Sequence, residues 1–504
     1  MQRLAFFGMF LFVPLFAQAF PIQRNLGVTL EALQSELNPE RLSPRQCAGV
    51  LDRVSAAFLE MEASDLDPGL ARSQGRAWVG QLFRLRLSLN SHLKSLTRQG
   101  LAGDAEGFEC ARAVRRISRA FRSLEDQLIL WSLQPKEFDS KTDPAAGPVL
   151  QGSSPQLLRR DATAPVRLRS GDVLLSRGNS FISAAIARIS REEAQFSHMA
   201  QVYIDAPVGT TVSIEDALMD PRVKTVEAHI EVGVFTRPFR DYVRDGNSRV
   251  LLFRPLMTAA RAHLAGRSVH DGVLAYQQKK MREAGRSRPT VNDNPPYDFR
   301  MDLHDSSEIF CSEVVALAFR SVGLQLPFFQ SPLRSNPFTR RMGLAADRTF
   351  APADIEIDPN FELVAEWRDV RKLATVARKE AALSAMYRWM DQRAYRFHTM
   401  APDWLAAWIG WSARQAGLGF QSLMPKNMKR DTIAIVFSLE RVGLALEKRL
   451  ISVEKAERRA GRQGPSPFFA EQQDQLEMYR AEDEREFRAH RRDEFHTDFN
   501  WNLW

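Results

Sequence analysis

The chain has 504 residues, of which 44% are hydrophobic and 26% are charged. These ordinary globular values exclude a largely disordered, collagen-like or multi-span membrane chain, and the length predicts two to four domains. Three cysteines are too few for a disulfide-dense scaffold. The net charge of +8 is a mild excess over a long chain, so it suits anionic cell-envelope partners and gives little support for nucleic-acid binding.

The first nineteen residues have the features of a secretory signal peptide. A short basic start precedes an almost wholly apolar run, Leu4–Phe16, and small residues stand at Ala17 and Ala19. The run is too short to span a bilayer as a helix. We therefore expect residues 1–19 to be removed and the mature chain to be secreted or periplasmic. An uncleaved anchor is the alternative, because a proline follows the cleavage site at position 21.

Residues 20–135 are predicted to form a helical bundle. A helix-start signal at Ser43 is followed by three stretches in which apolar residues recur every three or four positions. In an up-down-up bundle, Cys47 and Cys110 would both stand at helix starts at the same end. We therefore expect them to form a disulfide in an oxidising compartment, with two buried free thiols as the alternative. Cys311 is then left unpaired.

Three further regions follow the bundle. Residues 136–165 contain four prolines and many small or polar residues, which indicates a linker. Residues 166–369 alternate strand-like and helical stretches, which predicts an α+β domain with an antiparallel sheet, and residues 370–504 are again helical. The expected strands are 172–176, 199–204, 225–230 and 250–253, and the expected helices are 180–189, 259–283, 311–322, 370–397, 431–459 and 472–491.

Cys311 has the sequence context of a reactive thiol. The apolar stretch Val314–Phe319 predicts a buried helix, which places the thiol near free backbone amides and the positive end of the helix dipole. Both favour a thiolate, and the amides can also hold an oxyanion. A base is expected beside it, and His198 stands at the head of a predicted strand, where a histidine without a catalytic role is the alternative. Glu227 is a carboxylate in an otherwise apolar strand, and His229 faces the same way as a reserve candidate.

Five pieces of residues 166–369 carry a family resemblance through their order. They are Leu168–Leu175, Phe196–His198, Val226–Ala228, Tyr297–Phe299 and Phe310–Glu313. Together they resemble the circularly permuted NlpC/P60 papain-like enzymes, YiiX-like branch, in which histidine and acid precede the cysteine. The resemblance implies a permuted papain-like fold, flanked here by two helical regions.

The same resemblance assigns roles to single residues. It implies that Cys311 is the nucleophile, His198 the base and Glu227 the acid that orients the base. Tyr297, Asp298 and Ser312 would support the site or bind substrate, although Asp298 is equally consistent with a loop cap. The segment between the histidine strand and the glutamate strand, residues 205–224, is longer than the family pattern, which weakens the assignment of Glu227 most.

The expected function is that of a cysteine hydrolase or acyltransferase that cleaves amide bonds in cell-wall peptides. A thiol hydrolase of lipid esters or acyl chains is the first alternative, and a non-catalytic envelope scaffold with a vestigial papain-like domain is the second. We expect no cofactor and no metal, because the sequence has no His-Glu-x-x-His motif and no phosphate-cradling glycine loop. The oligomeric state is left open.

The segment Trp404–Trp411 is the most apolar part of the chain after the first nineteen residues. We predict a helix that packs in the C-terminal region. The alternative is peripheral contact with a membrane, in which an interfacial helix places its tryptophans at the depth of the lipid headgroups.

Overall fold

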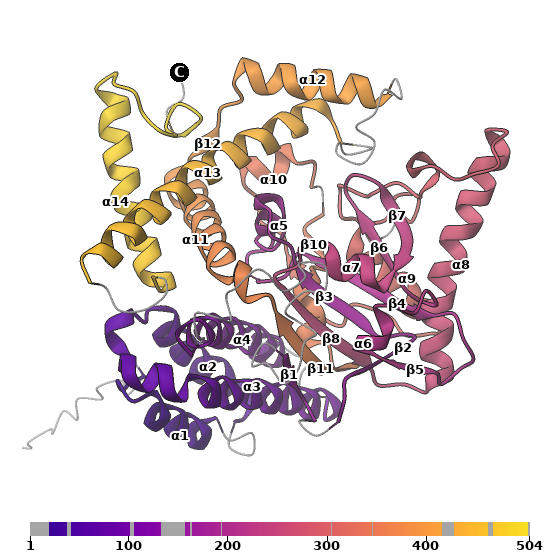
Figure 1. Cartoon of the computed structure of the whole chain (residues 1–504), viewed down its shortest axis with the longest axis horizontal. Coiled ribbons are helices and arrows are strands. Elements are labelled where there is room, and N and C mark those ends of the chain that lie inside the picture. Colours follow the sequence, from indigo (N-terminus) through magenta and orange to yellow (C-terminus); the bar gives the residue numbers. More distant parts are fainter. Residues whose placement is uncertain are drawn as a thin grey trace, which may run out of the picture.

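The structure is a computed structural model. It describes residues 20–37, 42–100, 105–132, 157–161, 164–192, 194–303, 305–344, 346–415, 428–461 and 467–501. The predicted signal peptide and most of the predicted linker lie outside the described residues. The described part is a mixed α+β fold with one large antiparallel sheet. In Figure 1 the N-terminal helices lie at the lower left, the C-terminal helices at the upper left, and the sheet with its own helices at the right.

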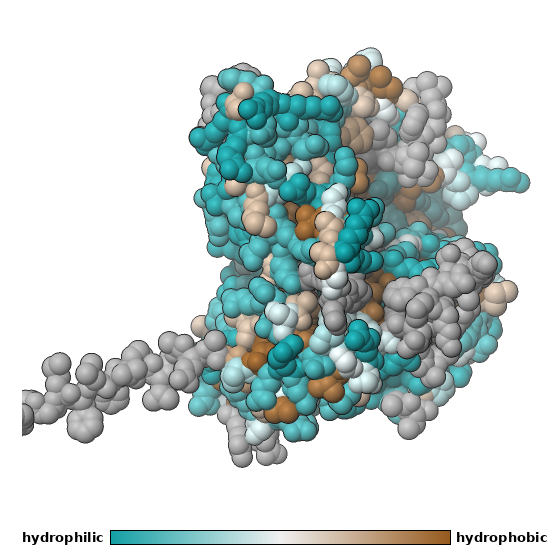
Figure 2. All heavy atoms as spheres, turned by 60° about the vertical axis from the view of Figure 1, so that its left-hand side comes forward, coloured by the Kyte–Doolittle hydropathy of each residue, from teal (hydrophilic) through white to brown (hydrophobic). Residues whose placement is uncertain are grey.

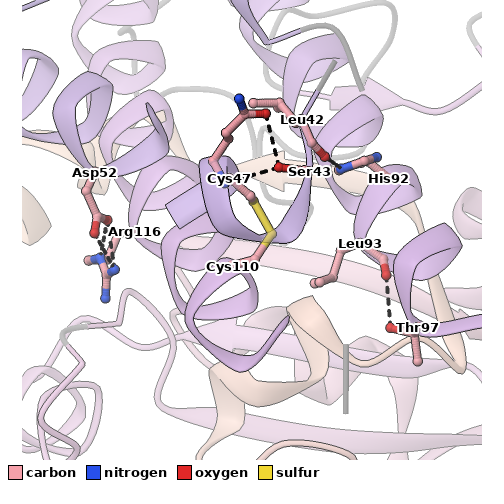
Figure 3. The surroundings of a disulfide bond; sticks show 10 residues. Leu42, Ser43, Cys47, Asp52, His92, Leu93, Thr97, Cys110 and Arg116 are labelled. Carbon is pink, nitrogen blue, oxygen red and sulfur yellow. Dashed lines mark hydrogen bonds and ion pairs between the residues drawn. A yellow bond between two sulfur atoms is a disulfide. The ribbon is translucent and has the colours of Figure 1, made fainter. Parts of the chain in front are cut away.

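Four helices form the N-terminal bundle. They are α1 (Leu26–Glu36), α2 (Pro44–Leu59), α3 (Pro68–Arg98) and α4 (Ala105–Ser132). The Ser43 side chain caps α2 as expected, and α4 packs against both α2 and α3. A disulfide joins Cys47 of α2 to Cys110 of α4, which confirms that prediction (Figure 3). The prediction of three helices omitted α1, although Leu26, Leu30 and Leu33 are buried at helical spacing.

The large sheet has seven strands in the order β1-β11-β8-β3-β4-β6-β7, and every neighbouring pair is antiparallel. The strands are β1 (Leu157–Arg159), β3 (Val173–Arg177), β4 (His198–Ile204), β6 (Val223–His229), β7 (Gly233–Pro238), β8 (Arg249–Pro255) and β11 (Phe361–Arg368). The β1 strand falls within residues 136–165, so part of the predicted linker forms a sheet edge. The strands β7 and β11 also lie where no strand is predicted from the sequence.

Helices and short strands surround this sheet. The helices are α5 (Phe181–Ile186), α6 (Ile214–Ala217), α7 (Phe239–Arg244), α8 (Ala259–Glu283), α9 (Cys311–Arg320) and α10 (Pro337–Arg341). Two short strand pairs are β2 (Arg167–Arg169) with β5 (Thr211–Ser213), and β9 (Ser331–Pro332) with β10 (Arg348–Thr349). The long segment 205–224 folds into β5 and α6 beside β2, and this leaves β4 and β6 paired as neighbours.

The C-terminal region consists of long helices and one small strand pair. Its elements are α11 (Val370–Arg393), β12 (Arg396–Phe397), α12 (Ala401–Gln415), α13 (Arg430–Arg459), α14 (Phe469–Arg488) and β13 (Phe499–Asn500). Helix α13 contacts α11, α12 and α14. The three helices predicted at 370–397, 431–459 and 472–491 are therefore confirmed, with ends that differ by up to four residues.

A buried network of arginines and carboxylates joins the bundle to the sheet. Arg86 of α3 donates to Glu125 of α4 at 2.8 Å and forms an ion pair with Glu366 of β11, also at 2.8 Å. Arg368 donates to Asp126 at 2.7 Å. Burial opposes ionisation of Glu366, but the surrounding arginines hold the pKa of that carboxyl well below its ordinary value. Because a buried charge is tolerated only with its partner, the network fixes the position of the bundle on the sheet.

Candidate active site

The Cys311 thiol lies at the start of a buried helix, as the sequence predicts. Cys311 is the first residue of α9, and Phe310 before it has an extended backbone. Cys311 is only 3% exposed. Helix α9 packs against β4 and β6. Burial opposes ionisation of the thiol, but interactions with the His198 ring, the backbone N–H of Met199 and Ser312 lower its pKa below the ordinary value. The Ser312 hydroxyl oxygen is 3.9 Å from the sulfur.

His198 is held between the thiol and Glu227. Ala200 pairs with Glu227 across β4 and β6, and residues two apart on a strand share a face, so His198 lies on the same face as Glu227. The Nε2 atom of His198 is 2.8 Å from an oxygen of Glu227, which leaves Nδ1 for the thiol. Burial lowers the pKa of His198, but its interactions with Cys311 and Glu227 outweigh burial and raise it to about 9.

Glu227 is fully buried and surrounded by hydrogen-bond donors. One oxygen accepts from Thr225 Oγ1 at 2.9 Å and from Arg237 Nε at 2.7 Å, and the other lies 2.8 Å from His198 and 3.0 Å from His229. Burial opposes its ionisation, but its contacts with His198 and His229 keep the pKa of Glu227 well below the ordinary value. The carboxylate is therefore ionised and stabilises a charged His198. The length of segment 205–224 does not disturb this contact.

His229, the reserve candidate for the base, contacts the same oxygen of Glu227 as His198 does. Its ring stands edge-on to the His198 ring, with centroids 4.9 Å apart. Ligand atoms of His198, Glu227 and His229 all lie within 4.8 Å of one another, a spacing that a metal ion could use. However, Arg237 donates to both oxygens of Glu227. Because a guanidinium already neutralises this carboxylate, the arrangement suits a hydrogen-bonded acid–histidine pair better than a cation site.

Tyr297 contacts the thiol, whereas Asp298 turns away from it. Tyr297 is 2% exposed, and its hydroxyl interacts with Cys311. Burial is the main cause, and nearby negative charge the second, that raises the pKa of this phenol well above its ordinary value. The Asp298 carboxylate accepts from the backbone N–H groups of Arg300 and Asp302, each at 2.7 Å. The structure thus brings Tyr297 into the site, while Asp298 caps the loop that carries Tyr297.

Arg237 and Thr225 are the site residues that sequence reasoning missed. Thr225 stands two residues before Glu227 and therefore shares its face of β6. This spacing is visible in the sequence and could have identified Thr225. Arg237 comes from β7, a strand that was not predicted. In the sequence, Arg237 stands between Thr236 and Pro238 and looks like any exposed arginine in a loop.

An apolar cavity adjoins the thiol site through Tyr297. Fourteen of the described residues line it, and all of them are hydrophobic. They are Ile182, Ala185, Ile186, Ile189, Ile230, Tyr297, Phe299, Met301, Phe338, Met342, Leu344, Met428, Val436 and Leu439. The last three belong to α13 or directly precede it, so the C-terminal helices complete a cavity that begins in the sheet domain.

Helix α12 reaches the rim of the same site. Arg414 near its end is 4% exposed; burial lowers the pKa of its guanidinium, and the charge of Glu231, in the turn between β6 and β7, opposes that shift. Glu231 in turn interacts electrostatically with His229 and His198. The C-terminal region therefore lines the cavity and places the charge of Arg414 within electrostatic reach of Glu231.

No family model matches the chain, and no curated protein or solved structure is significantly similar to it. Among the helices that the structure describes, none combines the length and the apolar character that crossing a bilayer requires.

Proposed function

We propose that the protein is a cysteine hydrolase or acyltransferase with a permuted papain-like catalytic domain and a Cys311–His198–Glu227 triad. The single observation that supports this most is the continuous line of contacts from the thiol through the imidazole to an ionised, buried carboxylate. The histidine, acid, cysteine order along the chain also agrees with the permuted family. The secreted or periplasmic location remains part of this proposal.

The reaction would follow from these contacts. His198 takes the thiol proton, and the Cys311 sulfur forms a bond to the substrate carbonyl carbon. Charge that develops on the carbonyl oxygen is met by backbone N–H groups in the first turn of α9, which have no partner within the helix. His198 then gives its proton to the leaving amine or alkoxide as the bond to the carbonyl carbon breaks. Water or another acceptor, deprotonated by His198, releases the acyl group and regenerates the thiol pair.

Two substrate classes fit this chemistry. The family resemblance favours amide bonds of cell-wall peptides. The second candidate is an ester or amide of a long acyl chain, and the apolar lining beside Tyr297 favours it, because such a lining suits a hydrocarbon better than a charged glycopeptide. The cavity encloses about 40 Å³, so its walls would have to move apart to admit a chain.

The proposal is tested in two stages. Cys47 and Cys110 form a disulfide, so Cys311 is the only thiol available to an alkylating probe. We expect the folded protein to be labelled faster than the denatured protein, and His198→Ala to remove the difference. Products from muropeptides and phospholipids are then compared, with Cys311→Ala as the control. A chain that keeps its cellular function as Cys311→Ser would instead be the non-catalytic scaffold.

A further inference from the structure

Helix α12 exposes its large apolar side chains and buries its charged ones, the reverse of an ordinary surface helix. Its large apolar residues face outward: Trp404 is 49% exposed, Leu405 52%, Trp408 43% and Ile409 51%. We call these four residues the apolar face. The charged residues of the helix, Asp403 and Arg414, are both buried. A helix on a water-exposed surface normally buries its apolar stripe and exposes its charges.

This orientation is fixed by specific contacts on the inner side of α12. The Asp403 carboxylate accepts from Ser438 Oγ at 3.2 Å and forms an ion pair with Arg441, both on α13. Ala407 is fully buried in a small apolar cluster with Met428 and residues of α13. Rotating α12 to hide the apolar face would expose Ala407 and break the ion pair, so the outward position of the tryptophans is the stable one.

Exposed cations stand near both ends of α12. Arg396 precedes the helix, and Lys429 and Arg430 follow it at the start of α13. The guanidinium of Arg430 lies 5.1 Å from the ring centre of Trp411. None of these three cations forms an ion pair with another described residue. In Figure 2 a hydrophobic patch lies at the top of the molecule, on the side where α12 stands in Figure 1.

We propose that the apolar face of α12 docks on the surface of a lipid bilayer that contains anionic phospholipids. Tryptophan and aliphatic side chains that project from one face of a helix suit the boundary between headgroups and acyl chains. The flanking cations would contact the phosphates. A protein partner or a second copy would not require cations at both ends of an apolar helix. Docking uses no residue of the triad, so the proposal stands independently of the proposed function.

Vesicle sedimentation of the full mature chain tests the proposal. The vesicles consist of phosphatidylcholine alone or of phosphatidylcholine with a minority of phosphatidylglycerol. We expect binding that is stronger with phosphatidylglycerol, that weakens as salt is raised, and that falls about ten-fold or more in Trp404→Ser/Trp408→Ser because two aromatic anchors are lost. Lys429→Gln/Arg430→Gln should reduce only the part of the binding that depends on phosphatidylglycerol.

Two controls separate docking from folding and catalysis. Trp501→Ser removes a tryptophan that is also 43% exposed but lies outside α12, and it should bind as the wild type does. Cys311→Ala should also bind normally, whether or not the protein is an enzyme. Binding that is absent, or unchanged in the double tryptophan variant, would overturn the proposal. So would a wild-type oligomer that becomes monomeric in that variant, because a second copy would then cover the face.

Discussion

Replacing Glu227 with glutamine should move the pH at which Cys311 becomes reactive. The substitution keeps the shape of the side chain and removes its charge. In the wild-type protein the thiol and Glu227 together raise the pKa of His198 to about 9 against the effect of burial, and the pKa of Cys311 is lowered. Both shifts favour a thiolate beside an imidazolium over the neutral pair. The thiol should become reactive as pH rises above its lowered pKa. Its reactivity should change again as pH rises through about 9, because His198 then loses its proton.

The magnitude follows from the 2.8 Å contact between His198 and Glu227. A hydrogen bond to a charged group contributes about 1.5–3 kcal/mol, and one pKa unit corresponds to about 1.4 kcal/mol. The pKa of His198 should fall by about one to two units, and proton transfer from the thiol to the imidazole becomes less favourable by the same free energy. The acid limb of Cys311 reactivity should therefore move to higher pH, by as much as about one to two units.

The assay is the rate of alkylation of Cys311 as a function of pH, followed by the mass of the intact protein. Glu231→Gln is the matched control, because Glu231 lies on the same rim and makes no hydrogen bond to His198 among the described contacts, so its shift should be much smaller. Thermal unfolding shows whether each variant is folded. A folded Glu227→Gln protein whose reactivity profile matches the wild type would refute the triad.

Four further outcomes follow from the structure. Arg86→Met should lower the free energy of unfolding by about 3–5 kcal/mol in a denaturant titration, because Glu125 and Glu366 lose one of the buried arginines that neutralise them and must share Arg368; a loss under 1 kcal/mol, the surface ion-pair range, would contradict that role. Reduction of the Cys47–Cys110 bond should cost about 2–4 kcal/mol in the same measurement. Tyr297→Phe should slow alkylation of Cys311 about five-fold through loss of one hydrogen bond, and no change would remove Tyr297 from the site. If acyl chains occupy the cavity, Leu439→Trp should abolish hydrolysis of long-chain esters and spare short-chain ones.

Most of the secondary structure around the site could be predicted because local signals mark it. The helix predicted at residues 259–283 is observed as Ala259–Glu283, since Thr258 caps its first turn. The strands that carry His198 and Glu227 are short and mostly buried, and both of their ends lie within two residues of the predicted positions. The disulfide could be predicted because the up-down-up arrangement of α2, α3 and α4 brings the starts of α2 and α4 together.

The missed strands had weaker or ambiguous patterns. The β7 strand is an edge strand in which only Gly233 and Val234 are buried, so its sequence lacks the alternation of a half-buried strand. The β11 strand does alternate, with Phe361, Leu363 and Ala365 buried, but Glu366 and Arg368 give it the composition of a surface segment. Their burial depends on Arg86 and other partners from distant parts of the chain, which no local pattern reveals.

The boundary predicted at residue 369 separates parts of the chain that the site uses together. Met428, Val436 and Leu439 line the apolar cavity, and Arg414 lies near Glu231 on the rim. The resemblance to permuted papain-like enzymes ends before all four of these residues. The proposed thiol chemistry therefore rests on the sheet domain, whereas part of the lining of the adjoining cavity comes from helices outside the resemblance. Because Tyr297 contacts the thiol and also lines the cavity, the cavity that those helices complete begins beside Cys311.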